Sequence, residues 1–143
     1  MMDLKVKRLT DTAKLPTKAH PTDAGFDLYC DASFEIPKSD QVFLVPTGFS
    51  LAIPDGYYGR IVGRSGLTSK TSLRVLEGII DSDYRGELKI MITSNSCIYG
   101  DMIESGSKIA QLIIQPLPQF EIIEADVLPS SERGNGGFGS TGV

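Results

Sequence analysis

The stretch with the densest chemistry in this sequence is GIIDSDYRGE, residues 78–87. It places two carboxylates, an aromatic ring and a fixed cation close together, at Asp81, Asp83, Tyr84 and Arg85. A carboxylate can take a proton from water, a ring can pack on a flat ligand, and a guanidinium can bind an anion. The alternative is a solvated turn, in which the aspartates bond to the backbone and Tyr84 covers a core edge. These residues alone leave both interpretations open.

A second stretch, GRIVGRSGLT at residues 59–68, is suited to anions. An extended run ends there in Arg64, Ser65 and Gly66, at the start of a predicted helix over residues 65–72. Free N–H groups at a helix start attract anions. Ser65 could equally be an ordinary N-cap with Arg64 solvated.

The third stretch, residues 106–114, reads GSKIAQLII. One uncharged amide, Gln111, interrupts its strand-like apolar run. A buried amide must find hydrogen-bond partners, and these can be structural or catalytic.

From Pro129 to Val143 the composition becomes rich in glycine. Such a segment cannot pack a core of its own, so the plain interpretation is a flexible terminus. The arm nevertheless carries an arginine, a ring and two adjacent hydroxyls, at Arg133, Phe138, Ser140 and Thr141. With glycines that let N–H groups surround phosphate oxygens, it is suited to close over a polyphosphate.

The elements that must position these groups are short strands. Proline or glycine punctuates the chain at short intervals, and runs with a period near two lie between, such as 49–53, 89–93 and 121–124. Apolar runs at 75–80 and 88–92 predict a strand, a polar turn and a second strand around the first stretch. The pattern predicts an all-β sandwich, jelly roll or barrel with one short helix.

Bulk composition narrows the classes of function. A length of 143 residues, with 41% hydrophobic and 22% charged residues, predicts one globular domain. A net charge of −4 argues against a nucleic-acid duplex as the main partner. The two cysteines, Cys30 and Cys97, lack metal or disulfide spacing, which favours a reduced, intracellular protein. The start at residues 1–8 alternates like a strand and has no signal-peptide core, and no stretch is long enough to span a membrane.

The order and spacing of five stretches carry a family resemblance. They are residues 24–28, 59–68, 78–87, 106–114 and 133–142. Together they resemble the five motifs of the homotrimeric dUTP pyrophosphatases. The resemblance implies a jelly-roll-like (β-clip) barrel over residues 1–128 and an arm, residues 129–143, that closes over a neighbouring subunit's active site. It implies a homotrimer whose three sites are shared, with a hairpin from one subunit and the second and fourth motifs from another.

The reaction implied by the resemblance is Mg²⁺-dependent hydrolysis of dUTP to dUMP and pyrophosphate, which lowers dUTP and supplies the precursor of dTTP. Water attacks the α-phosphorus, and Asp81 matches the carboxylate that orients and deprotonates it. Tyr84 matches the ring that packs on deoxyribose, while backbone groups around Gly78 and Ile80 match those that read uracil. The implied location is the cytoplasm, or the nucleus for a eukaryotic or viral source.

The other motifs supply the phosphate and metal contacts of the family. Gln111 and Arg64 match catalytic positions, and Ser65 and Gly66 match phosphate contacts. Asp27 matches a carboxylate that approaches the metal through water, as expected for Mg²⁺ held chiefly by substrate phosphates. The matching substrate-binding residues of the arm are Phe138, which covers uracil, and Arg133, Gly139, Ser140 and Thr141, which include the γ-phosphate clamp.

Three departures and three alternatives accompany the resemblance. Phe26 stands where tyrosine is common in the family. Gly63 replaces a frequent proline, and Glu77 stands where uncharged residues are usual, so we expect its side chain to point outward or to pair with Arg74. A dCTP deaminase would need an acid/base at the pyrimidine, for which Glu77 is the one candidate. A nucleotide-responsive regulatory trimer and a structural β protein are the non-enzyme alternatives; against both, every matched polar position is retained.

Overall fold

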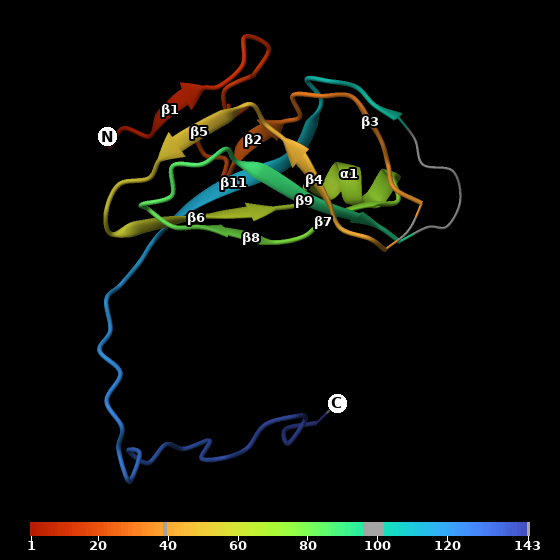
Figure 1. Cartoon of the computed structure of the whole chain (residues 1–143). Coiled ribbons are helices and arrows are strands. Elements are labelled where there is room, and N and C mark those ends of the chain that lie inside the picture. The colour runs from red at the N-terminus through yellow and green to blue at the C-terminus, as the bar shows by residue number, and fades with distance from the viewer. Residues whose placement is uncertain (39, 96–101, 143) are drawn as a thin grey trace.

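The computed structural model describes residues 1–38, 40–95 and 102–142 (Figure 1). Its elements are β1 (Lys5–Arg8), β2 (Phe26–Tyr29), β3 (Phe34–Glu35), β4 (Phe43–Pro46), β5 (Phe49–Ala52), β6 (Tyr57–Val62), α1 (Ser65–Lys70), β7 (Leu73–Val75), β8 (Gly78–Ile80), β9 (Lys89–Ser94), β10 (Met102–Ile103) and β11 (Lys108–Pro116). The predicted all-β class with one short helix is therefore confirmed, as is a first strand near the N-terminus.

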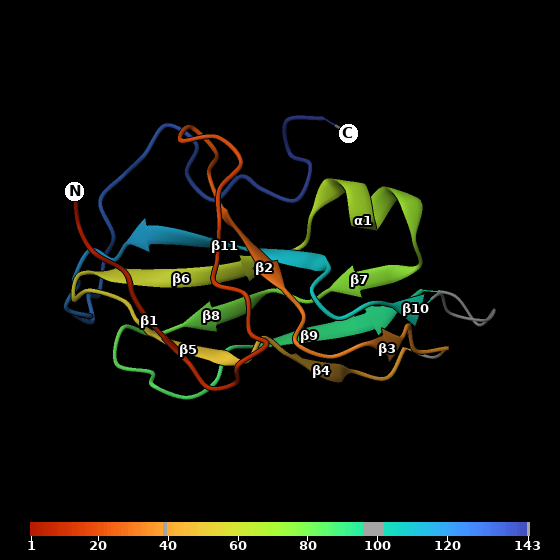
Figure 2. The ribbon, with the colours of Figure 1, turned by 90° about the horizontal axis from the view of Figure 1, so that it is seen from above.

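The strands form four antiparallel sheets. Their orders are β1-β5, β10-β3, β2-β11-β6-β8 and β4-β9-β7. Figure 2 shows β11, β6 and β8 side by side. Within the described ranges these sheets do not close into a complete barrel. No helix there is long and apolar enough to cross a membrane.

The core forms because alternate strand residues point inward. In β9, Ile90 and Ile92 are fully buried while Lys89 is exposed, and in β6 Ile61 is buried between half-buried neighbours. One hydrophobic cluster joins β2, β5, β6, β9 and β11. The long strand β11 is consequently fixed in the middle of its sheet.

The hairpin expected around residues 78–87 is wrong, because the two strands on either side of the turn do not pair with each other. β8 pairs with β6, through Gly59↔Ile80 and Ile61↔Gly78, whereas β9 pairs with β4 and β7. The apolar run at 75–80 is divided into β7 and β8 by Leu76 and Glu77. The turn at residues 81–86, called here the acidic turn, therefore connects two sheets rather than two paired strands.

The strand predicted at residues 121–124 is also absent, and this prediction is wrong for the single chain. Regular pairing ends at Pro116, and Leu117 N–H donates to the carbonyl of Gly56 at 2.8 Å. Residues 117–128 are exposed and carry no strand or helix. Figure 1 shows this segment leaving the body of the molecule. A strand pattern needs a partner strand, and among residues 1–38, 40–95 and 102–142 of the single chain it has none.

The helix α1 begins at Ser65 as predicted and ends at Lys70, two residues early. Its N-cap is Arg64 in an extended conformation, so the alternative in which Ser65 serves as the N-cap is wrong. The sequence Tyr-Gly-Asp at residues 99–101 also predicts a turn, but these residues and Cys97 lie outside the described residues. Cys30 is buried, with its thiol 3.2 Å from the carbonyl of Glu104.

Candidate active site

The first candidate site is a polar pocket of about 270 Å³. It is lined by Asp23 and by residues of the first, second and fourth motifs, namely Ala24, Gly25, Asp27, Arg64, Ser65, Gly66 and Gln111. Sheet register explains this meeting of three distant stretches. Gln111 on β11 lies opposite Asp27 on β2 and opposite Val62 on β6, two residues before Arg64.

The Gln111 amide is hydrogen-bonded at its nitrogen and closely packed against Gly25 at its oxygen. Its Nε2 donates to the carbonyl of Gly63 at 2.8 Å, which fixes the loop between β6 and α1. A Cβ added to Gly25 would lie 2.7 Å from Gln111 Oε1 and 3.2 Å from its Cβ. A larger residue at Gly25 would require the Gln111 side chain to move, so the first motif and the amide of the fourth are packed against each other.

Charge in the polar pocket is concentrated on Asp27. Its Oδ1 lies 3.0 Å from Arg64 Nε, and its Oδ2 lies 3.0 Å from Lys108 Nζ. The Asp27 side chain is only 17% exposed, so these ion pairs are partly shielded from water. Arg64 is therefore held by an ion pair, and the alternative in which its side chain is simply solvated is wrong. Lys108 was missed as a site residue, although it lies three positions before Gln111.

A second pocket, of about 320 Å³, lies beside the acidic turn. It is lined by Leu44, Ile61, Gly78, Ile79, Ile80, Asp81, Tyr84, Glu87, Lys89 and Met91. The structure thus brings together the predicted site residues Gly78, Ile80, Asp81 and Tyr84, whereas Asp83 and Arg85 do not line this pocket. Leu44, Lys89 and Met91 come from β4 and β9 and carry no signal in the sequence beyond their strand pattern.

Backbone contacts set the shape of the acidic turn. Tyr84 N–H donates to the carbonyl of Asp81 at 3.2 Å, and its hydroxyl donates to the carbonyl of Glu87 at 2.9 Å. Arg85 Nη1 donates to the carbonyls of Ser82 and Tyr84 at 2.6 and 3.0 Å. Among the described residues the Asp81 carboxylate accepts no hydrogen bond, and the residue is exposed. The hydrogen bonds that fix the acidic turn therefore do not involve the side chain of Asp81.

The arm touches neither pocket in the single chain. Its hydrogen bonds are local, such as Arg133 Nε to the carbonyl of Gly136 at 2.7 Å and Ser140 N–H to the carbonyl of Gly137 at 3.1 Å. Phe138 is fully exposed with a positive φ of 51°. Figure 1 shows this part of the chain set apart from the sheets. The predicted site residues therefore fall into three groups that one chain does not unite.

Glu77 pairs with a different partner from the one expected. Its Oε1 lies 2.9 Å from Arg60 Nε on the neighbouring strand, while Arg74 Nη1 donates to the carbonyls of Thr68 and Thr71. The hydrogen bond and the attraction of Glu77 raise the pKa of Arg60. Because its charge is matched by Arg60, Glu77 does not act as a lone carboxylate beside the second pocket.

Asp27 suits a magnesium ion held mainly by a ligand's own phosphates. Across the described ranges, no three His, Cys, Asp or Glu side chains gather into a metal-binding cluster. Both Asp27 oxygens are already engaged by cations, so a carboxylate contact through water fits better than direct ligation. Mg²⁺ keeps several waters and is commonly bound by one carboxylate plus phosphates, so the donor set fits.

Comparison with known proteins gives one consistent result. The family model described as dUTPase matches residues 11–142. The deoxyuridine 5'-triphosphate nucleotidohydrolase of Arabidopsis thaliana is 42% identical over 139 residues, covering 97% of this chain and 82% of the plant protein.

Solved structures agree. The dUTPase of Staphylococcus bacteriophage 80alpha with dUPNHPP superposes with a TM-score of 0.91 at 32% identity, covering all of both chains. The D95N dUTPase of S. aureus phage phi11, described with a structural Mg(II) ion, gives a TM-score of 0.80 at 28% identity, covering 88% of this chain and 98% of the phage chain.

Proposed function

This chain belongs to the dUTPase family and hydrolyses dUTP to dUMP and pyrophosphate, and we propose that each of its active sites is built from more than one copy of the chain. One observation carries the proposal. Among the described residues, the polar pocket and the pocket at the acidic turn share no lining residue, and the arm reaches neither. A site that needs all three groups must borrow some of them from another copy, and we propose a homotrimer.

Asp81 is proposed as the general base. Its exposed carboxylate accepts no hydrogen bond from the described residues, so it is available to a water molecule. Asp81 takes one proton from that water as the oxygen attacks the α-phosphorus of dUTP. The bond from this phosphorus to the bridging oxygen breaks, and pyrophosphate leaves with the electron pair. A positioned base of this kind contributes roughly 10²- to 10⁴-fold to the rate.

The polar pocket is proposed as the site for the phosphates. Arg64, with Ser65 and Gly66 beside it, presents a forked cation, a hydroxyl and an exposed backbone. Gln111 lies at the same pocket, with one N–H of its Nε2 donated to the Gly63 carbonyl. Its Oε1 can accept a hydrogen bond from the attacking water, and its second N–H can donate to a phosphate oxygen. Incoming phosphates would share Arg64 with Asp27, since the two already lie 3.0 Å apart.

A bound Mg²⁺ would supply positive charge that offsets the charge developing on the phosphates. In this chain Asp27 is the carboxylate proposed to contact it through water. Lys108 and Arg64 would hold Asp27 in place for that role.

The base and sugar are proposed to occupy the pocket at the acidic turn. β8 is the last strand of its sheet, so one edge of Gly78 to Ile80 pairs with β6 and the other leaves backbone groups for uracil. The Tyr84 ring lines this pocket and is fixed through its hydroxyl to Glu87. Packing of that ring against deoxyribose would exclude a 2′-hydroxyl. Backbone groups that pair with uracil would reject a base that leaves them unpaired.

The arm of another copy is proposed to close this site. Phe138 would cover uracil, while Arg133, Ser140 and Thr141 would bind the γ-phosphate, with Gly139 giving the backbone its turn. Gly139 has a φ of 87°, a conformation in which glycine is favoured. Closure removes water and strengthens each charge contact inside. We also propose a reducing compartment such as the cytoplasm, for which the buried free thiol of Cys30 gives support.

Pyrophosphate release from dUTP, dCTP, UTP and dTTP, each with Mg²⁺ and with a chelator, tests this function. Turnover of dUTP with Mg²⁺ should exceed that of the other three nucleotides by at least a hundredfold. Binding of dUTP without pyrophosphate release would favour the regulatory alternative, and ammonia release from dCTP would favour the deaminase.

A further inference from the structure

The segment that precedes the first motif, residues 14–18, runs along the outer edge of β2 and is called here the strap. Thr17 pairs with Asp27 through two backbone hydrogen bonds of 2.6 and 3.3 Å, and its hydroxyl lies 2.6 Å from the hydroxyl of Tyr29. β2 is an end strand of its sheet, with β11 on its other side. The strap is therefore fixed beside the strand that carries Asp27 of the polar pocket.

The strap places Lys14 on the same face of β2 as Asp27. Leu28 is buried in the core, so its neighbours Asp27 and Tyr29 point to the opposite face of the strand. Lys14 is exposed, and its Nζ lies 5.4 Å from the centre of the Tyr29 ring. The same Nζ donates to the carbonyl of Gly106, at the start of the fourth motif, at 3.2 Å. These two contacts hold the ammonium group beside the pocket rather than in it.

Three cations follow one another on this face. Tyr29 lies opposite Lys108 in the register of β2 and β11, and Lys108 Nζ lies 3.0 Å from the Asp27 carboxylate. Arg64 Nε lies 3.0 Å from the other oxygen of that carboxylate, and Arg64 Nη1 lies 3.5 Å from the carbonyl of Lys108. Lys14, Lys108 and Arg64 are called here the cation row. The row leads from the strap to the polar pocket.

The cations of the row differ in how their charge is matched. Lys108 and Arg64 share Asp27, and Asp23 adds a second carboxylate to the lining of the pocket. Two cations and two carboxylates therefore balance there. Lys14 instead contacts a carbonyl oxygen and an aromatic ring, neither of which carries a net charge. Among the described residues no carboxylate forms an ion pair with Lys14, so it supplies the unmatched positive charge of the row.

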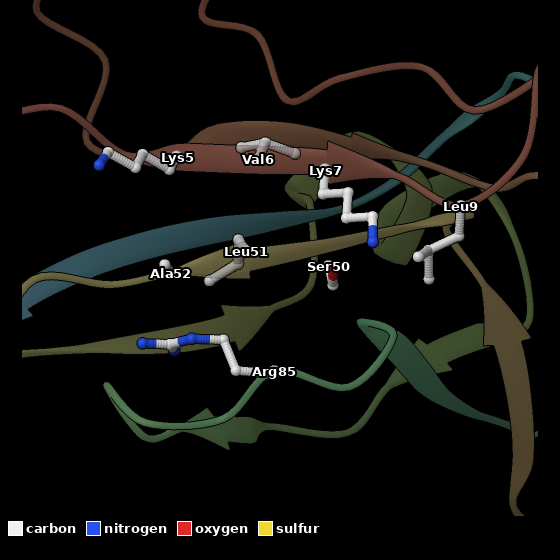
Figure 3. Close-up of a pocket in the computed structure, with 8 residues that line it drawn as sticks. All are labelled: Lys5, Val6, Lys7, Leu9, Ser50, Leu51, Ala52 and Arg85. Atoms are coloured by element: carbon white, nitrogen blue, oxygen red, sulfur yellow. The ribbon is translucent and has the colours of Figure 1, made fainter.

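Other exposed cations belong to a different region. Lys5 and Lys7 border a cleft of about 390 Å³ across β1 and β5, and Figure 3 shows Arg85 on its far side. This cleft shares no lining residue with the polar pocket. The whole chain has a net charge of −4, which repels a polyphosphate in solution. Unmatched positive charge beside the polar pocket can offset that repulsion where the ligand must enter.

We propose that Lys14 steers the triphosphate of the nucleotide toward the polar pocket during approach and does not hold it once bound. The inference rests on the proposed function, which places the phosphates in that pocket. Lys14 does not line the pocket, so its charge acts mainly on the association rate constant, kon. Salt should remove the effect, because dissolved ions screen charges beyond about 8 Å at physiological ionic strength.

Stopped-flow binding of a non-hydrolysable dUTP analogue tests the steering without any need for turnover. A chelator is present so that the ligand keeps its full charge. At about 20 mM salt, Lys14→Gln should lower kon about threefold and Lys14→Glu about tenfold, while koff stays within about 1.5-fold. Lys14→Arg keeps the charge and should retain kon. Thermal unfolding checks that each variant folds.

Salt and ligand charge separate steering from a structural effect of the substitutions. At about 0.5 M salt the losses in kon should shrink to less than about 1.5-fold. With dUMP, which carries about half the charge of the triphosphate, Lys14→Glu should lower kon only about threefold. A disturbed strap would slow both ligands equally and at every salt concentration.

Lys38→Gln is the matched control. It removes the same unit charge from an exposed side chain that pairs with Glu35, so kon should stay within about 1.5-fold of the wild type. An equal loss in this control, a loss that persists at high salt, or an equal loss with dUMP would overturn the proposal. So would a rise in koff as large as the fall in kon, because Lys14 would then hold the bound nucleotide.

The two proposals fail in different ways. A protein that hydrolyses dUTP while Lys14→Glu leaves kon unchanged would remove the steering role alone. A protein whose binding is steered but that releases no pyrophosphate would keep the steering role and remove the proposed function.

Discussion

Arg64 and Arg133 are both assigned to phosphates, but the chain holds them in opposite ways. Arg64 lies two residues after a six-residue strand, is 3.0 Å from a shielded Asp27, and shares its pocket with an amide held by sheet register. Arg133 donates a hydrogen bond to the carbonyl of Gly136, three residues ahead, and the residues at 131–135 are all exposed. One arginine is fixed before any ligand arrives, and the other is not.

The difference shows where ordering is required. The polar pocket was organised when the sheet formed, so a phosphate that binds there meets groups already in place. The arm, rich in glycine, must lose backbone freedom of about 1–2 kcal/mol per residue when it closes. That loss is offset only if closure makes contacts that matter to the reaction. The rigid region therefore suits recognition, and the mobile region suits a closure that assembles the site.

The largest effect is expected at Asp81, the proposed general base. It lies in neither the polar pocket nor the arm, but it acts on the substrate that both are proposed to bind. Asp81→Asn keeps the shape of the side chain and removes its basicity, so kcat should fall by about 10³-fold while the Kd for a non-hydrolysable dUTP analogue changes by less than about threefold. Stopped-flow proton release and calorimetry measure the two quantities. Asp83→Asn, two residues away in the same turn, is the control and should retain most of kcat.

Removal of residues 129–143 tests the mobile region. The truncated protein should keep its sheets and lose roughly 10²-fold in kcat/KM, since the closing ring, cation and hydroxyls are lost. Circular dichroism and steady-state pyrophosphate release check this. If the shortened chain unfolds or falls apart into single copies, the arm is mainly structural and the comparison with Arg64 loses its meaning.

Gly25→Ala tests the rigid region. The new Cβ would lie 2.7 Å from Gln111 Oε1 in a buried site, so either the amide or the backbone must move. Overpacking of this kind costs about 1–3 kcal/mol, and we expect kcat/KM to fall by roughly 10- to 100-fold. Gly63→Ala is the matched control, because its Cβ would meet Thr68 and Val75 at 3.4 and 3.7 Å, ordinary contact distances. A loss as large in the control would mean that the pocket is not specially close-packed at Gly25.

The smallest effect is expected at Cys30, a buried residue that lines neither pocket. Burial raises the pKa of the Cys30 thiol. In the unfolded chain this thiol ionises near pH 8.5, so above that pH the unfolded state holds fewer protons than the folded state, and the free energy of unfolding falls as pH rises. Urea unfolding at pH 7 and pH 10, in a Cys97→Ser background, should show a smaller decline for Cys30→Ala. An unchanged decline would mean that Cys30 does not titrate differently on folding.

The sequence predicted the features that depend on local residue patterns, and it missed the features that depend on which strands pair with one another. The strands at 49–53 and 89–93 and the helix start at Ser65 follow from period and punctuation, and the structure has them. The partner of β8 could not be predicted, because a strand followed by a turn and a strand gives no sign that both strands belong to different sheets. The pairing of Glu77 with Arg60 depends on that same register.

The candidate site was predicted as a set of residues but not as an arrangement. Motif order alone nominated Asp27, Arg64 and Gln111, which register then places in one pocket. Lys108 was missed because its role depends on Asp27 lying on the adjacent strand. The alternating pattern at 121–124 is present in the sequence, yet in the described chain this segment pairs with no other strand. Contacts that another copy supplies cannot be derived from one copy.

Mixing two inactive proteins tests most directly whether each site is shared. Chains with Asp81→Asn retain the arm, and chains cut after residue 128 retain Asp81. Refolded together in equal amounts, they should form mixed assemblies whose pyrophosphate release is at least tenfold above either protein alone, because one copy's arm closes over another copy's base. Release equal to the mean of the two parents, in assemblies shown by mass to be mixed, would contradict the account.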